Sequence, residues 1–282
     1  MHIAWPWEQK HTRIGRRRFF WYLAIGIGTL AVSALLFFYF SPQTAVRLRE
    51  DLSFAREPSA ALAFAYGEQH LDADNADEYD INRAQYFFMK AAQLDPSTPY
   101  LFHELARIAF LRGNLTHALA LIDVQISLYG DTEPNSYYVR GLIEGYMGNY
   151  DAAITDYTHF LTFDSQDWAA MNDDAWVLLK AGKFQQAADI TAKGLTLFPE
   201  NPWLLNSRAT ALYELGNYSQ ALAVEQRASM YVGSVSQAAW LHSYPGNDPE
   251  NASAGIASFT AAVAENMHRM ELAVASSTVQ SK

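Results

Sequence analysis

One stretch of the sequence comes close to a catalytic zinc motif. Residues 103–107, His-Glu-Leu-Ala-Arg, match the start of the His-Glu-x-x-His helix, in which two histidines bind zinc and the glutamate acts as general base. Arg107 stands where the second histidine is required, and a guanidinium group cannot bind zinc. The chain also lacks cysteine, which excludes thiolate metal sites and cysteine nucleophiles. We therefore expect no metal centre at this position.

Five acidic residues gather within residues 72–80, whose sequence is DADNADEYD. An EF-hand calcium loop needs glycine at its sixth position and glutamate at its twelfth, but Asp77 and Arg83 stand there. We expect a solvated loop in which Asp80 caps the next helix, with calcium binding as the alternative. The sequence has no phosphate-binding glycine loop and no Gly-x-Ser-x-Gly turn. We predict that the protein is not an enzyme and needs no cofactor.

Charge is distributed unevenly along the chain. Five basic residues and one glutamate give residues 1–18 a charge of +4, which leaves −14 for the rest of a chain whose net charge is −10. An acidic body offers no cationic face that could release counterions from a phosphate backbone. We therefore expect no binding to nucleic acid.

An uncharged apolar segment follows the basic residues. As a helix, the 22 residues 19–40 would extend about 33 Å, and the hydrocarbon core of a bilayer is roughly 30 Å thick. The arginines directly before the segment predict, by the positive-inside rule, that residues 1–18 lie in the cytoplasm. The sequence thus predicts a single-pass protein of the inner or plasma membrane whose remaining chain lies outside the cytoplasm.

Other interpretations of this amino-terminal region stay open. A cleaved signal peptide would have a shorter apolar core and a better cleavage site than residues 43–45. Arg16 and Arg17 resemble a twin-arginine export signal, and a reversed topology would place the body of the chain in the cytosol. The segment Trp5-Pro6-Trp7 fits a tail at the lipid interface or a short docking motif for a partner.

A period of about 34 residues organises the rest of the chain. A glycine, a small residue before it, a large apolar residue just after it and an alanine further on recur at constant offsets, which is typical of stacked helix–turn–helix units. The glycines can adopt a positive φ in the turns, and the small residues let two helices approach closely. The four sets are Ala106, Gly113, Leu115 and Ala118; Gly141, Gly148, Tyr150 and Ala153; Ala175, Gly182, Phe184 and Ala187; and Ala209, Gly216, Tyr218 and Ala221.

These units resemble the tetratricopeptide repeat. Residues 134–167 carry the resemblance best, with Tyr137 near the early aromatic position of the family, and Pro199 matches the proline that ends a repeat. Glu144 and Glu225 depart from the pattern, because the family favours aromatic residues there. The resemblance implies an all-α solenoid, a right-handed superhelix of antiparallel helix pairs, that binds other proteins.

The predicted domain organisation follows from these features. We expect a membrane-anchored helical-repeat protein that ends in a capping helix, because a solenoid must cover its last apolar face. Apolar residues in 249–276 form one helical stripe, for which the alternative to capping is pairing with a second copy of the chain or with a partner. The divisions are a basic tail (1–18), a transmembrane helix (19–40), a linker (41–57), a solenoid (58–235) with an irregular first repeat (58–98) and regular repeats (99–132, 134–167, 168–201 and 202–235), and a helical cap with a disordered tail (236–282).

The resemblance also implies where a partner binds. In this family the first helix of each repeat lines a concave groove, and the matching positions here are rich in aromatic and asparagine side chains. Such side chains suit an extended peptide or a partner's helix, and the alternative is that they pack between neighbouring hairpins. The candidates are Tyr100, His103, Arg107, Asn135, Tyr138, Asn172, Trp176, Trp203, Asn206 and Tyr213.

We therefore predict a membrane-anchored scaffold that binds protein or peptide partners and supports the assembly of an envelope complex. A structural subunit of a larger membrane complex is the alternative, and a receptor that faces the cytosol would follow from the reversed topology.

Overall fold

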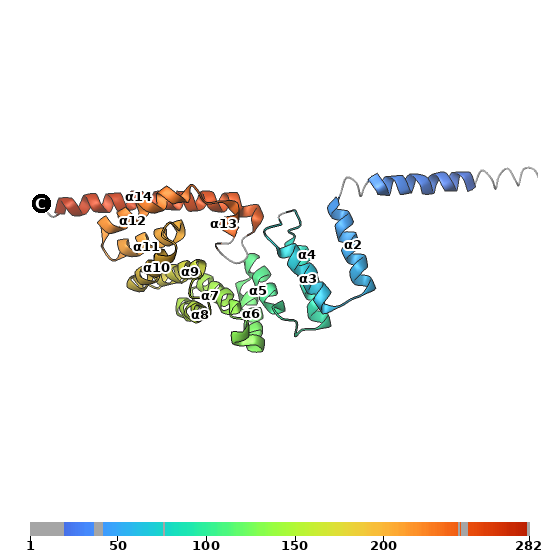
Figure 1. The fold of residues 1–282 in the computed structure, drawn as a ribbon, viewed down its shortest axis with the longest axis horizontal. Coiled ribbons are helices and arrows are strands. Elements are labelled where there is room, and N and C mark those ends of the chain that lie inside the picture. Colours follow the sequence, from blue (N-terminus) through green and yellow to red (C-terminus); the bar gives the residue numbers. More distant parts are fainter. Residues whose placement is uncertain (1–19, 37–41, 76, 242, 244–247, 281–282) are drawn as a thin grey trace, which may run out of the picture. The chain divides into compact units, whose positions relative to one another are not determined.

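A computed structural model describes residues 20–36, 42–75, 77–241, 243 and 248–280. All regular secondary structure within these residues is helical. The chain forms two compact units, Met1–Pro58 and Ser59–Lys282, which are described separately (Figure 1).

The first unit contains two helices in its described part. Residues 20–36 are helical, and α2 (Pro42–Arg56) follows. Within the described residues, no helix reaches both the length and the apolarity needed to cross a membrane. The predicted tail 1–18 and residues 19 and 37–40 of the predicted span lie outside the described residues.

The second unit consists mainly of five helix pairs (Figure 1). The two helices of each pair pack against each other, and the second helix of one pair contacts the first helix of the next. This is the arrangement that the repeat period predicts. The pairs are α3 (Ala60–Leu71) with α4 (Ile81–Leu94), α5 (Leu101–Leu111) with α6 (Leu115–Tyr129), α7 (Asn135–Met147) with α8 (Tyr150–Phe163), α9 (Trp168–Lys180) with α10 (Phe184–Leu197), and α11 (Pro202–Glu214) with α12 (Tyr218–Val232). A short 3₁₀ helix (Gly130–Thr132) precedes α7.

Local signals at the helix ends behave as the sequence predicts. The glycines of the four regular turns have φ values between 71° and 85°, where a side chain would be strained. Asp80 caps α4, because its carboxylate accepts hydrogen bonds from the backbone N–H groups of Asn82 and Arg83. The irregular hairpin α3–α4 therefore has its predicted helix start despite its long loop.

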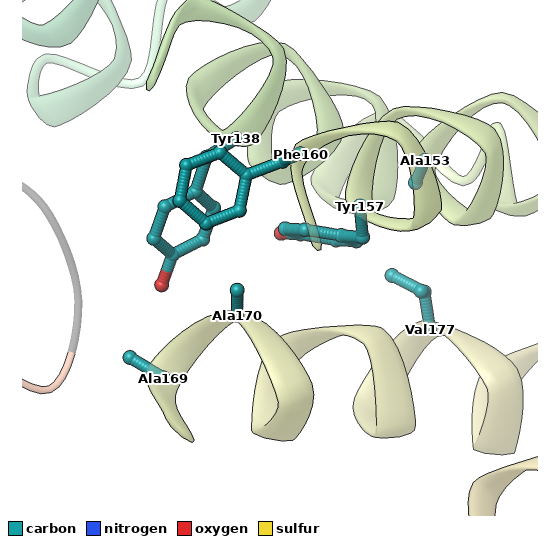
Figure 2. Packing of buried hydrophobic residues seen from close by; sticks show 7 residues of the cluster. All are labelled: Tyr138, Ala153, Tyr157, Phe160, Ala169, Ala170 and Val177. Atoms are coloured by element: carbon teal, nitrogen blue, oxygen red, sulfur yellow. The ribbon is translucent and has the colours of Figure 1, made fainter. Parts of the chain in front are cut away.

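The small residues lie where helices cross. A Cβ atom on Gly141 would come within 3.2 Å of the Tyr157 ring, and Ala153 has no exposed surface. Figure 2 shows Tyr157 between α8 and α9, above Ala170 and Val177, while Tyr138 and Phe160 lie side by side at the edge of the same cluster. The cluster is thus shared by two repeats, so neither repeat buries its apolar face alone.

The carboxy-terminal helix packs where the first helix of a further repeat would lie. After α13 (Gln237–Leu241) and a 3₁₀ turn (Pro249–Asn251), α14 (Ala252–Gln280) runs along α12 and α11. Val263 lies with Leu205 and Val232, and Met270 lies with residues near the start of α12. The apolar stripe that a second copy of the chain would use is therefore packed within this chain.

The end of α14 differs from the sequence prediction. Residues 276–280, expected in a disordered tail, are helical, whereas 281 and 282 lie outside the described part of the chain. The hydroxyl groups of Ser276 and Ser277 donate hydrogen bonds to the carbonyls of Leu272 and Val274. These bonds within the preceding turns accommodate polar residues in the helix.

Candidate functional site

The first helices of the early repeats line an open cavity of about 1100 Å³. It is lined by α3 and the loop after it, by α5 and α7, by the start of α9, and by Leu241 of α13. Half of the predicted groove residues line this cavity: Tyr100, His103, Arg107, Asn135 and Tyr138. The side chains that line it combine aromatic rings with carboxylates.

The α5 wall holds a buried histidine beside an ion pair. His103 is 6% exposed, and its Nδ1 lies 3.2 Å from the Ser136 hydroxyl. Burial lowers the pKa of His103 to about 4, so the imidazole is neutral at neutral pH. Arg107 Nη1 donates a hydrogen bond of 2.6 Å to Glu104 Oε2, which neutralises both charges. Because the imidazole already contacts Ser136, it is a structural part of the wall.

Tyr100 enters α5 in a strained backbone conformation. Its φ of 59° and ψ of 0° are left-handed, and among the described residues it is the one non-glycine with a positive φ. Its N–H donates to Glu133 Oε2 at 3.3 Å, and its ring meets the His103 ring edge to face. Strain of this kind persists only where the surroundings impose it, and it is concentrated at binding sites.

A buried hydrogen bond joins Tyr138, which lines the cavity, to the next repeat. The Tyr138 hydroxyl donates to Asp173 Oδ2 over 2.8 Å, and both side chains are buried. Burial raises the pKa of Asp173 to about 7 and raises the pKa of Tyr138 well above its usual value. A neutral hydroxyl thus meets a carboxyl group that titrates near neutral pH, and this contact fixes the Tyr138 ring.

The other five predicted residues lie away from the cavity and contact neighbouring helices. Three of them reach α14: Trp203 stacks on Phe259, Asn206 accepts a hydrogen bond of 2.8 Å from Asn266, and the guanidinium of Arg269 lies over the ring of Tyr213. The other two contact adjacent repeats, since Asn172 accepts from Ser207 and Trp176 packs on Tyr146.

Sequence reasoning missed one wall of the cavity and several residues of the other walls. Phe64, Glu68, Asp72 and Asp74 come from α3 and its loop, and Trp168 begins α9. The first hairpin lies outside the regular period, so no groove positions were assigned to it. The acidic loop itself is the available signal, but its sequence predicts a solvated turn, with a calcium loop as the alternative.

No group of three or more histidine, aspartate or glutamate side chains that could hold a metal ion occurs within the described residues. In the zinc-like stretch 103–107, the histidine contacts Ser136 and the glutamate pairs with the arginine.

Comparison with known proteins identifies the repeats. Two family models, both described as Tetratricopeptide repeat, match residues 138–202 and 178–238. The human Tetratricopeptide repeat protein 6 is 26% identical over 129 residues, which cover 46% of this chain and 24% of the relative. This chain therefore spans about a quarter of the length of the curated relative it matches.

Solved structures share the fold at low sequence identity. MamA superposes with a TM-score of 0.53 at 16% identity and covers 62% of this chain and 92% of its own. YrrB, described as a TPR protein with an unusual peptide-binding site, gives 0.54 at 14% identity, with coverage of 64% and 91%. A tetratricopeptide repeat protein from Parabacteroides merdae gives 0.53 at 14% identity, with coverage of 80% and 94%. Residues 138–238 are therefore tetratricopeptide repeats within an all-helical solenoid.

Proposed function

We propose that this protein is a membrane-anchored scaffold that binds a peptide segment of a partner protein in the cavity between α3, α5, α7 and α9. The observation that carries the proposal is the cavity itself, whose lining includes accessible aromatic and polar side chains on the first helices of tetratricopeptide repeats. Five predicted groove residues converge there from two helices that the repeat period placed side by side.

The chemistry of the lining suits a peptide. Asn135 is exposed at the start of α7, and its amide can both donate to and accept from a peptide backbone. Phe64, Tyr100 and Trp168 are half-buried rings that supply contact area at a low cost in side-chain entropy. An extended segment or a short helix of a partner fits these features better than a compact small molecule, because the cavity is large and open along the repeats.

Membrane attachment and envelope assembly belong to the same proposal. They are supported by the apolar composition of residues 19–40 and by the arginines before them, which by the positive-inside rule favour repeats outside the cytoplasm. Protease accessibility of the repeats in intact cells tests this part. Digestion from outside is expected, whereas protection until lysis would contradict the proposed topology.

Site-specific photocrosslinking tests the binding site. A photoreactive amino acid replaces Asn135 in the full-length chain, and the crosslinked products from intact cells are identified by mass spectrometry. The matched control replaces Asn217, an exposed asparagine at the α11–α12 turn that lies outside the cavity. A defined partner crosslinked from position 135 and not from 217 is expected. Equal products from both positions, or none from 135, would refute binding in this cavity.

A further inference from the structure

We infer that the cavity selects a partner segment rich in lysine and arginine. This inference rests on the proposed function, because it names the chemistry of the segment that the scaffold binds.

The charged residues that line the cavity are unbalanced. Five carboxylates are present and one guanidinium, and none of the lining residues is a lysine: the acids are Glu68, Asp72, Asp74, Glu104 and Asp167, and the base is Arg107. Arg107 is already paired with Glu104. His103 contributes no charge, because burial lowers its pKa to about 4. Carboxylates therefore outnumber cationic groups in the lining by five to one.

Two acids from the carboxy-terminal part of the unit act on a residue of the loop after α3. Asp248, which caps the 3₁₀ turn before α14, and Glu250 within that turn both act electrostatically on Tyr79, and so does Arg107 of the cavity wall. Burial is the first cause that raises the pKa of Tyr79 to about 12, and Asp248 is the second. Carboxylates from distant sequence positions thus act on Tyr79, which lies in the loop after α3 whose first residues line the cavity.

Glu68 shows how the neighbouring acids act on one carboxylate of the lining. It makes no hydrogen bond or ion pair with any residue that the structure describes. Glu68 is an exposed residue of the lining, and desolvation, followed by the charge of Glu104, raises its pKa to about 7, although Arg107 opposes the shift. A bound ammonium or guanidinium group would relieve this repulsion and favour the ionised carboxylate.

The aromatic walls suit the rest of a basic side chain. Lysine and arginine have apolar stems that pack on rings while the charged group reaches carboxylates. The accessible rings of Phe64, Tyr100 and Trp168 lie in the same cavity as these acids. Elsewhere in this chain the same contact is already made, since the Arg269 guanidinium carbon lies 4.4 Å from the centroid of the Tyr213 ring. A basic segment therefore satisfies both features of the lining, whereas an acidic segment would be repelled.

The test measures peptide binding to the full-length chain in a neutral detergent. Three fluorescent peptides of equal length alternate alanine with lysine, serine or glutamate, and their anisotropy is followed as protein is added. The lysine peptide is expected to bind about tenfold more tightly than the serine peptide, and the glutamate peptide most weakly. Raising sodium chloride from about 0.1 M to about 1 M shortens the screening length from about 10 Å to about 3 Å and should remove the preference.

Two matched variants separate the cavity from the acidic surface as a whole. Glu68→Gln removes one negative charge from the cavity and is expected to weaken binding of the lysine peptide about fivefold. Glu265→Gln removes the same charge from the exposed side of α14 and should leave binding unchanged. Equal weakening by both variants would show general attraction to an acidic protein and would overturn the inference.

The remaining outcomes distinguish failure of this inference from failure of the proposed peptide-binding function. If serine and lysine peptides bind equally at the cavity, the inference is wrong and the proposed peptide-binding function stands. If no peptide binds, the inference is also wrong, and crosslinking from position 135 decides the proposed function separately. If removal of residues 1–18 strongly increases binding of the lysine peptide, the basic tail of this chain is the occupant of the cavity. That outcome would overturn the inference that a partner's segment binds there.

Discussion

The two ends of the solenoid use equivalent repeat positions differently. Tyr100 is the second residue of the first regular repeat and lines the cavity, whereas Trp203 is the second residue of the last repeat and stacks on Phe259 of α14. The two rings of that stack are 5.2 Å apart and only 3° from parallel. In the same way, His103 lines the cavity and Asn206 bonds to α14. A position in the repeat thus provides a ligand surface or a packing surface according to what lies next to it.

The largest expected effect comes from removing the contact that covers the last repeat. Met270 has no exposed surface and packs against both helices of that repeat. Met270→Ala should lower the free energy of unfolding by about 2–5 kcal/mol, because it leaves a cavity under α14. Chemical denaturation measures the change. Leu272→Ala is the control, since Leu272 is 56% exposed and its truncation should change stability by less than about 0.5 kcal/mol. Equal effects of the two variants would mean that α14 does not cover the repeat.

A second substitution tests the close helix crossing that recurs in the regular repeats. Ala153 is fully buried at the crossing of α7 and α8, so Ala153→Leu should overpack it and lower stability by roughly 1–3 kcal/mol. Ala152 is exposed on the same helix, and Ala152→Leu should leave the thermal midpoint nearly unchanged. A stable Ala153→Leu variant would show that the assigned repeat register is wrong.

The covered end should also depend on pH. Glu225 is fully buried beneath α14, and burial raises its pKa from 4.5 to about 8, although Arg269 opposes the shift. The folded chain therefore keeps a proton that the unfolded chain releases, so stability is full below about pH 4.5 and falls as the pH rises to about 8. Asp173 and Asp174 act in the same direction, because burial raises the pKa of each to about 7.

Glu225→Gln isolates this contribution. The amide mimics the protonated acid, so the variant should be more stable than the natural chain at about pH 8, by roughly 1–2 kcal/mol, and nearly equal to it at about pH 5. His103 acts oppositely, since its lowered pKa costs stability only as the pH falls below 6.5. Because both proteins contain His103, its contribution cancels when their denaturation curves are compared at about pH 5 and about pH 8. An unchanged pH dependence in the variant would show that Glu225 is ionised in the folded chain.

The smallest effect on stability is expected at the open end. Tyr100→Gly relieves a left-handed backbone that costs a side chain roughly 1–2 kcal/mol, and it also removes the ring contact with His103. Stability should therefore change by less than about 1 kcal/mol. Binding of the lysine peptide should weaken, because the ring is lost from the cavity. A large loss of stability without a change in binding would assign Tyr100 to packing alone.

Several features of the fold could be predicted because they depend on neighbouring residues. α4 (Ile81–Leu94) begins directly after the predicted cap Asp80 and ends before Asp95-Pro96. The turn glycines have the positive φ that their spacing indicated. The membrane span and the function of the groove residues stay predictions.

Other features depend on contacts between distant residues. Glu225 is a departure from the repeat pattern, and the sequence could not show that α14 buries it. The cavity wall formed by Phe64 and Glu68 was missed because the first hairpin has a long loop and breaks the period. No local rule relates that hairpin to α5 or α9.

The sequence by itself determined the repeat register, the turns and the helix crossings. These follow from backbone sterics at glycine, from capping, and from the periodicity of small and apolar residues, all of which act over a few turns of helix. Only the tertiary structure decided which repeats keep an accessible concave side and which are covered. That outcome depends on where α14 packs and on which carboxylates, from residues as distant as Asp72 and Asp167, meet around one cavity.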